Sequence, residues 1–181
     1  NQARRGTRCT IMNEHEFYQW IGTARGWQFD DIRATLAPEP FNYYAVLAAH
    51  VPGANWLDLG CGSAAGLAEL IPACRQYTGL DRSPAMIAQA QATLAPLGSQ
   101  VRLQLADSFR AAPGAAFDLI SARHAPYHPG SVFALLAPGG RFISQQVEIH
   151  DKAALKDYFG RGQHHGASEL IAEGNRSAFE A

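Results

Sequence analysis

Short apolar runs and amphipathic segments alternate along the middle of the chain. Five segments have the length and apolar content of buried or half-buried strands. They are residues 55–59, 76–81, 100–107, 117–122 and 141–149. Segments of helical character separate them, and this alternation is typical of a parallel sheet with right-handed crossovers. The pattern therefore predicts an α/β fold whose sheet is covered by helices.

The predicted helices begin and end at recognisable capping residues. Ser83 caps the helix after the second strand, and Pro84 takes its first position. The N-terminal helix begins near Glu14 behind Asn13 and ends near Gly26. Further helices are expected over residues 41–51, over 64–71 up to Pro72, in a short stretch of 129–140 with a glycine stop, and over 151–160.

One folded domain is expected for most of the 181 residues. Met12 is a more convincing first residue for the folded domain than Asn1. Residues 1–11 are therefore expected to form a flexible extension. Residues 12–54 would form an N-terminal helical cap, and residues 55–160 the cofactor-binding core. The weakly patterned residues 161–181 would be a tail, either part of the same domain or poorly ordered.

Composition and charge narrow the class of protein. The net charge of -1 argues against a nucleic-acid footprint over the whole surface. Cys9, Cys61 and Cys74 have no metal-binding spacing and cannot all pair, which together with the lack of a signal peptide indicates a reduced, cytoplasmic protein. No apolar run approaches the roughly 20 residues of a membrane span, and no metal site is predicted.

Polar residues and glycines follow the predicted strands at the edge where a parallel sheet binds its ligands. Gly60 and Gly62 lie in the loop after the first strand, behind the acid Asp58. Glycines in such a loop let the backbone approach a nucleotide-like ligand closely. The other strand ends carry Asp81, Asp107, Ser108, Ser121, Arg123 and His124.

The acids at these strand ends suit particular parts of a nucleoside. Asp81 lies about 20 residues after the glycine loop, where a carboxylate accepts hydrogen bonds from both hydroxyls of a ribose. Asp107, one strand further out, would accept from the exocyclic amine of an adenine. Met86, on the helix after Asp81, would lie against the base, although methionine at this spacing is as often plain core. A capping or solvated strand end is the alternative for both acids.

The glycine loop suits a cationic nucleoside better than a dinucleotide. Gly60, Gly62 and Ala65 match a dinucleotide fingerprint, but the match alone is weak. Asp58 would repel a pyrophosphate, and the loop lacks the lysine of a P-loop. S-Adenosylmethionine has an ammonium, a sulfonium and no phosphate, and so fits an acid beside a glycine loop. An oxidoreductase that uses a nicotinamide cofactor is the alternative.

Five segments taken together resemble the class I S-adenosylmethionine-dependent methyltransferases. They are "WLDLGCGSAAG", "YTGLDRSPAMIAQA", "VRLQLADSF", "FDLISARHAPYH" and "APGGRFISQQV", which follow the family's order and spacing over about residues 40–150. The pieces "RGWQFDDI", "SARHAPYH" and "FISQQV" are similar to a small bacterial branch of methyltransferases. The resemblance implies a Rossmann-like, mostly parallel sheet with helices on both faces and S-adenosylmethionine as cofactor. The cofactor-binding residues expected are Asp58, Gly60, Cys61, Gly62, Asp81, Arg82, Met86, Asp107, Ser108 and Ser121.

Two features depart from the family pattern. Ala64 stands at the third glycine of the family loop, and Gly66 follows two residues later. The family sheet normally ends with a sixth strand and an antiparallel seventh, but no such pair is evident after residue 160. The sheet either lacks its last two strands or is completed in another way. An exposed fifth strand would favour pairing with a second copy, which predicts a homodimer.

Methyl transfer from a sulfonium mainly requires an aligned acceptor atom, because the leaving group is already activated. A base is needed only where the acceptor is protonated at the working pH. His124 is the candidate base, since it follows the fourth strand and the ordinary pKa of histidine, near ~6.5, suits proton abstraction. A histidine that holds the loop is the alternative. Expected substrate or lid residues are Trp27, Tyr43, Arg123 and Tyr127. Arg123 would hold a substrate carboxylate, with a surface ion pair as the alternative, and the alternative for the aromatic residues is helix-packing core.

The activity expected is methyl transfer to a small-molecule acceptor by direct displacement. One alternative is an enzyme that methylates RNA or protein, although the near-neutral charge and the lack of an added binding domain weigh against RNA. Another is a fold that binds the cofactor without catalysis.

Overall fold

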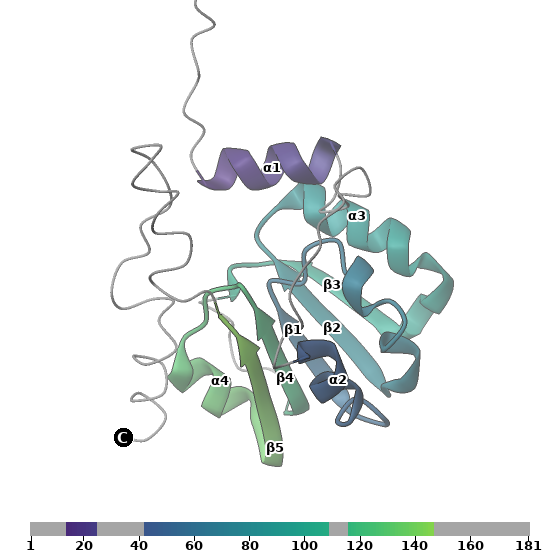
Figure 1. The fold of residues 1–181 in the computed structure, drawn as a ribbon, viewed down its shortest axis with the longest axis vertical. Helices are drawn as coiled ribbons and strands as arrows, with labels where there is room; N and C mark the ends of the chain where they lie inside the picture. Colours follow the sequence, from purple (N-terminus) through teal and green to yellow (C-terminus); the bar gives the residue numbers. More distant parts are fainter. Residues whose placement is uncertain (1–13, 25–41, 109–115, 147–181) are drawn as a thin grey trace, which may run out of the picture.

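A five-stranded parallel sheet forms the centre of the computed structural model, which describes residues 14–24, 42–108 and 116–146. The strands are β1(Asn55–Leu59), β2(Gln76–Asp81), β3(Val101–Leu105), β4(Phe117–Arg123) and β5(Leu136–Gln145). Their order is β3-β2-β1-β4-β5, and every neighbouring pair is parallel (Figure 1). The direction of strand addition reverses between β1 and β4. A parallel sheet binds its ligand at the carboxyl ends beside such a switch.

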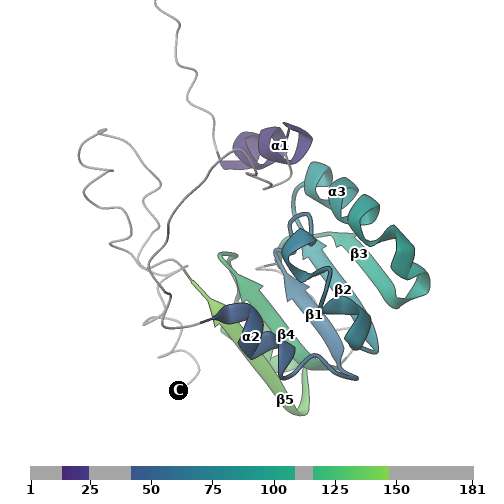
Figure 2. The ribbon, with the colours of Figure 1, turned by 45° about the vertical axis from the view of Figure 1, so that its right-hand side comes forward.

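Helices cover both faces of the sheet, where the buried side chains form two separate clusters. The helices are α1(Glu14–Ala24), α2(Tyr43–Ala48), α3(Pro84–Leu94) and α4(Pro129–Leu135). On one face, Trp56 and Tyr77 pack with α2 and α3, and Figure 2 shows α2 crossing the sheet. On the other face, Leu57 and Ile120 pack with α4. The prediction of a parallel, Rossmann-like sheet with helices on both faces is confirmed.

The helices α2 and α3 begin at side-chain caps. Ser83 Oγ accepts a hydrogen bond from the backbone N–H of Met86 at 3.3 Å, and Pro84 occupies the first helical position. Asn42 Oδ1 accepts in the same way from the backbone N–H of Ala45 at 3.1 Å. The predicted cap of α3 is therefore confirmed, and it fixes the direction in which the chain leaves β2.

The helix predicted over residues 64–71 is wrong. Two separate 3-10 turns, η1(Ala65–Leu67) and η2(Ile71–Ala73), occupy this connection. Pro72 has no N–H to continue an α-helix, and its ring clashes with the carbonyl group four residues earlier. Ala64 adopts a φ of 56°, which is incompatible with a regular helix start.

The glycine stop predicted for the short helix within 129–140 is also wrong. The helix α4 ends at Leu135, and β5 follows directly and contains Gly139, whose φ is 78°. The pairing of β5 with β4 shifts register between Phe117 and Leu119 of β4. Glycine suits such an irregular stretch of strand, because it has no side chain to place.

The helix α1 packs against the first part of α3. Gln89 Nε2 donates a hydrogen bond to the carbonyl oxygen of Gly22 at 2.6 Å, and Gln19 Oε1 accepts one from the N–H of Ala85 at 3.4 Å. A Cβ on Gly22 would lie 3.0 Å from the Cβ of Ala85, so glycine permits the close approach. Figures 1 and 2 both show α1 beside the start of α3.

Several predictions fall outside the described residues. They are the extension 1–11, the cap Asn13, the helix end at Gly26, the lid residue Trp27, the end of the fifth strand at 147–149, the helix 151–160 and the tail 161–181. The boundary between the helical cap and the core, predicted between residues 54 and 55, stays a prediction. The helix α2, which precedes this boundary, packs in the same hydrophobic cluster as β1, which follows it. In the three described ranges, no helix has both the length and the apolar character needed to cross a membrane.

Candidate cofactor site

The loop after β1 is held between the ends of β2 and β4. Gly60 has a φ of 73° and Gly62 a φ of 54°, a left-handed conformation that glycine adopts without strain. The backbone N–H groups of Gly60 and Cys61 both donate to the carbonyl oxygen of Leu80, at 2.8 and 2.9 Å. On the other side, a Cβ on Gly60 would overlap that of Ala125, which follows β4. The loop therefore requires glycine for both its conformation and its packing.

The carboxylate of Asp81 bridges this loop and the start of α3. Its Oδ2 accepts a hydrogen bond from the backbone N–H of Gly62 at 2.9 Å, and its Oδ1 accepts one from Ser83 at 2.8 Å. The side chain is half-buried at the end of β2. Each carboxylate oxygen accepts about two hydrogen bonds, so each retains capacity for one more. The residue is thus fixed in place with acceptors available for a pair of hydroxyls.

Asp58 is buried beneath the loop and bonded within the protein. Its Oδ1 accepts from the Ser121 hydroxyl at 2.6 Å, and its Oδ2 accepts from the Tyr77 hydroxyl at 3.0 Å. The Trp56 indole N–H donates to Ser121 Oγ at 2.7 Å. Because that indole can only donate, the single hydrogen of Ser121 is directed at Asp58. The four side chains form one buried network on the face covered by α2 and α3.

Burial raises the pKa of Asp58 to about 7, which is the largest effect on this group. The hydrogen bonds from Ser121 and Tyr77 act in the opposite direction, because they favour the ionised form. The nearby negative charge of Asp81 raises the pKa further. Two acids thus lie close together under the glycine loop, in a setting that favours a positively charged ligand.

Besides Asp58, four of the expected cofactor-binding side chains are buried and shape the site from within. Ser121 has no exposed surface, and Met86 is 1% exposed. The thiol of Cys61 lies against Gly79 of β2, where an added Cβ would come within 2.9 Å of the sulfur. Ser108 Oγ donates to the carbonyl oxygen of Pro126 at 2.9 Å and so joins the segments after β3 and β4. Met86 thus lies in the core, which is one of the two positions that its spacing favours. The other is contact with the base.

The two remaining expected residues are exposed. Arg82 directly follows β2, and Asp107 lies two residues after β3. Asp81 and Asp107 therefore stand at the ends of adjacent strands, because β2 pairs with β3 and Asp81 is in register with Leu105. Both acids therefore lie at the carboxyl-terminal edge of the sheet.

The helix α2 brings two tyrosines over the other side of the site. Tyr43 is buried, and its hydroxyl has no well-formed hydrogen bond among the described residues. Burial is the main cause that raises the pKa of this hydroxyl, and the negative charge of Asp58 raises it further. The Ser121 hydroxyl acts in the opposite direction and lowers this pKa. The Tyr44 hydroxyl lies against the loop, 2.7 Å from where a Cβ on Gly66 would stand. The guanidinium carbon of Arg123 lies 5.3 Å from the centre of the Tyr44 ring and 6.0 Å from that of Tyr43.

The end of β4 places the remaining candidates. His124 is exposed and has a φ of 53°, and its backbone N–H donates to the carbonyl oxygen of Gln145 at 2.8 Å. Tyr127 is only 4% exposed, and its ring packs edge-on against Phe142, with the ring centres 4.7 Å apart. His128 caps α4 by accepting from a backbone N–H through Nδ1. The Tyr127 ring is therefore part of the core, whereas His124 faces solvent.

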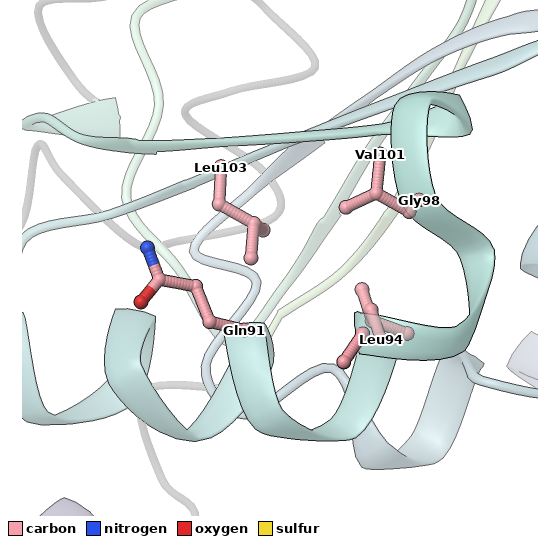
Figure 3. A pocket seen from close by; sticks show the side chains of 6 residues that line it. Gln91, Leu94, Gly98, Val101 and Leu103 are labelled. Carbon is pink, nitrogen blue, oxygen red and sulfur yellow. The ribbon is translucent and has the colours of Figure 1, made fainter.

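A separate pocket of about 210 Å³ lies between the end of α3 and β3 (Figure 3). It is lined by Gln91, Leu94, Ala95, Gly98, Val101 and Leu103. Val101 is the first residue of β3, so this pocket opens away from the carboxyl ends of the strands. Within the described residues, no group of three or more His, Cys, Asp or Glu side chains could hold a metal ion.

Sequence reasoning assigned no role to three residues that hold the site, although they lie within the motifs. Trp56 and Tyr77 are register partners whose rings meet edge-on, with their centres 5.2 Å apart. Tyr77 donates to Asp58, and Trp56 donates to Ser121, which in turn donates to Asp58. Gln145 Oε1 accepts from Arg123 Nε at 2.8 Å. A buried indole and phenol flanking an acid are a signal of such a network, but only the strand register shows that they meet.

Comparisons with known proteins find similarity to methyltransferases. A model of the methyltransferase domain family matches residues 57–140, which run from the middle of β1, through the glycine loop, to the first half of β5. The N-methyltransferase NodS from Bradyrhizobium japonicum WM9, in complex with S-adenosyl-L-homocysteine, has a similar fold with a TM-score of 0.58. The two sequences are 20% identical, and the match covers 76% of this chain and 71% of NodS. No curated protein matches the chain.

Two further solved structures are similar. An S-adenosylmethionine-dependent methyltransferase from Mesorhizobium loti is 26% identical with a TM-score of 0.52, over 59% of this chain and 54% of that one. The complex of DhpI with SAH is 20% identical with a TM-score of 0.52, over 81% and 83% of the two chains. The chain therefore spans between about half and about four fifths of these proteins.

Proposed function

We propose that the protein is a class I S-adenosylmethionine-dependent methyltransferase that transfers the cofactor's methyl group to a small-molecule acceptor. The match of residues 57–140 to the model of a methyltransferase domain supports this proposal. The observation that supports this most directly is the bridge from Asp81 to Gly62 and Ser83. It holds a carboxylate with spare acceptor capacity where a ribose diol would lie. The acidic surroundings of the loop suit a sulfonium cofactor better than a pyrophosphate.

The described residues fit this cofactor at several points. Asp81 would accept from the ribose hydroxyls, and Asp107 at the next strand end would accept from the adenine amine. The left-handed Gly60 and Gly62 leave the backbone exposed for the methionine portion. Asp58 would act from below the loop, through charge rather than direct contact, because its side chain is buried.

The cofactor, when bound, supplies an activated methyl group on a positively charged sulfur. The task left to the protein is to align a lone pair of the acceptor with the methyl carbon and to exclude water. His124 is the residue proposed to take the proton that a protonated acceptor must lose. Its exposed imidazole at the end of β4 lies on the side of β1 opposite to Asp81, as an acceptor-side residue would.

Two other functions remain alternatives. A fold that binds the cofactor without catalysis would contain the same Asp81 bridge but would methylate no acceptor. An enzyme that methylates RNA or protein is the other, and steeply salt-dependent binding to RNA would favour it. A homodimer through the β5 edge and a cytoplasmic location stay predictions of the sequence.

The test is calorimetry with S-adenosylmethionine and S-adenosylhomocysteine, with NAD as the control ligand. We expect micromolar binding of both sulfur compounds, no binding of NAD, and loss of binding in Asp81→Ala. An Asp118→Ala variant is the matched control, because Asp118 lies at the start of β4, near the opposite end of the sheet, and pairs with Arg75. Cofactor binding without turnover across a panel of small acceptors would favour the non-catalytic alternative. Binding of NAD instead would refute the proposal.

A further inference from the structure

Arg123 is held rigidly at the acceptor side of the site. It is the last residue of β4 and lies just beyond the pair formed by Leu59 and Ala122. Its Nε donates to Gln145 Oε1 on β5 at 2.8 Å, and its guanidinium stands over the rings of Tyr44 and Tyr43. Cation–π contacts and a fixed Nε orient the planar group while its side chain stays exposed to solvent.

The charge of Arg123 is not neutralised by an acid of the described residues. Among the described residues, its guanidinium contacts the amide of Gln145 and the rings of Tyr43 and Tyr44, and none of these groups is a carboxylate. Arg75, by contrast, pairs with Asp118 at 2.8 Å. An oriented guanidinium without an anionic partner retains two Nη groups that bind a carboxylate in the bidentate geometry.

The topology assigns this group to the acceptor rather than to the cofactor. Asp81 and Asp107 place the ribose and base over β2 and β3, whereas β4 lies on the other side of β1. A ligand that reaches Arg123 from the methyl group extends away from the adenosine, toward β5. Because a single guanidinium neutralises one negative charge, a monoanionic carboxylate fits this position better than a dianionic phosphate.

We propose that Arg123, cradled by Tyr44 and Gln145, binds a carboxylate group of the methyl acceptor. This inference rests on the proposed function and narrows its substrate class to small carboxylic acids. The acceptor atom would lie between the carboxylate and the methyl-bearing sulfur, so that the bound carboxylate fixes the orientation of the acceptor. Arg123 acts as a binding residue and takes no part in proton transfer.

The experiment uses ligand-observed NMR to measure the binding of benzoate and of its neutral isostere benzamide. The protein is saturated with S-adenosylhomocysteine. The same comparison is made with acetate and acetamide. We expect each acid to bind at least tenfold more tightly than its amide. Arg123→Gln should abolish this preference for the acid. Arg123→Lys should retain part of it, because lysine keeps the positive charge but lacks the planar pair of donors that binds a carboxylate in the bidentate geometry. Arg75→Gln is the control and should behave as the wild type.

The affinity for S-adenosylhomocysteine is measured separately in each variant. An unchanged affinity in Arg123→Gln, together with loss of the preference for acids, supports a carboxylate subsite for the acceptor. A weakened affinity in this variant would mean that Arg123 holds the carboxylate of the cofactor, which overturns the inference. Equal binding of acids and amides by the wild type, or a preference that survives in Arg123→Gln, overturns it too. Failure of the wild type to bind S-adenosylhomocysteine would instead refute the proposed function.

Discussion

Asp81 accepts a hydrogen bond from the backbone N–H of Gly62, 2.9 Å away, and thereby joins the end of β2 to the loop after β1. The two residues are 19 positions apart, and the same carboxylate also accepts from Ser83 ahead of α3. One side chain therefore organises the loop, the strand end and the helix start. Its remaining acceptor capacity is what the proposed ribose contact uses.

Replacing Asp81 by asparagine is expected to disturb the loop as well as the ribose contact. The amide keeps the size of the side chain, but its NH₂ group must face the N–H of either Gly62 or Ser83, which sets a donor against a donor. We expect the affinity for S-adenosylhomocysteine to fall at least tenfold and the free energy of unfolding to fall by about 1–2 kcal/mol. Calorimetry and urea unfolding measure the two effects. A variant that binds as tightly as the wild type would contradict the role of Asp81.

Gly60 and Gly53 allow a matched test of loop packing. Both have a φ above 70°, but a Cβ on Gly60 would overlap that of Ala125, whereas a Cβ on Gly53 would meet nothing within 4 Å. Gly53→Ala should therefore lower the free energy of unfolding by about 1 kcal/mol, from backbone strain alone. Gly60→Ala should cost about 2–4 kcal/mol, because the clash adds to the strain. Urea unfolding measures both, and equal losses would contradict the packing of the loop against Ala125.

The buried Asp58 predicts a stability that falls as the pH rises. Burial raises its pKa from the ordinary 3.8 to about 7 in the folded protein. Between these two values the unfolded chain has released a proton that the folded protein still holds, so the free energy of unfolding decreases with pH across this window. The contribution is fully present below about pH 4 and is lost as the pH passes about 7. Its size is a few kcal/mol at most.

Urea unfolding from pH 4 to pH 8 measures this dependence, with Asp58→Asn as the comparison. The amide cannot ionise, and it still offers an oxygen to Ser121 and an NH₂ group to the Tyr77 oxygen. We therefore expect the wild type to lose stability relative to this variant as the pH rises from 5 to 8. Asp118→Asn, at an exposed acid, is the control. A constant difference between wild type and Asp58→Asn over this range would show that Asp58 titrates as an ordinary acid.

The parts of the site that depend on local sequence were predictable. Ser83 and Pro84 mark a helix start wherever they occur, and the apolar run ending in Asp58 indicates a buried strand. The partners of Asp58 were not predictable, because Tyr77 lies 19 residues away and Ser121 lies 63 residues away. Only the register of β1 between β2 and β4 brings these hydroxyls to the carboxylate.

Tertiary packing accounts for the burial of Tyr127, and local backbone geometry accounts for the short turns found where a helix was predicted over residues 64–71. Tyr127 was expected to contact the substrate because it is a tyrosine that follows β4. In the structure its ring packs against Phe142 of β5 and is buried. The apolar segment before Pro72 looks helical, yet the proline and the left-handed Ala64 leave space only for short turns. Both outcomes depend on neighbours that hydrophobic periodicity does not describe.

The backbone of His124 distinguishes a catalytic from a structural role. Its φ of 53° is strained for histidine but not for glycine, so His124→Gly should unfold at a higher temperature than His124→Ala. Both variants lack the imidazole, so with an acceptor that must lose a proton both should lose about 10²-fold or more in kcat. Imidazole added to the buffer should restore part of the rate in His124→Gly. Unchanged kcat in both variants, with wild-type affinity for S-adenosylhomocysteine, would mean that this histidine only shapes the turn between β4 and α4.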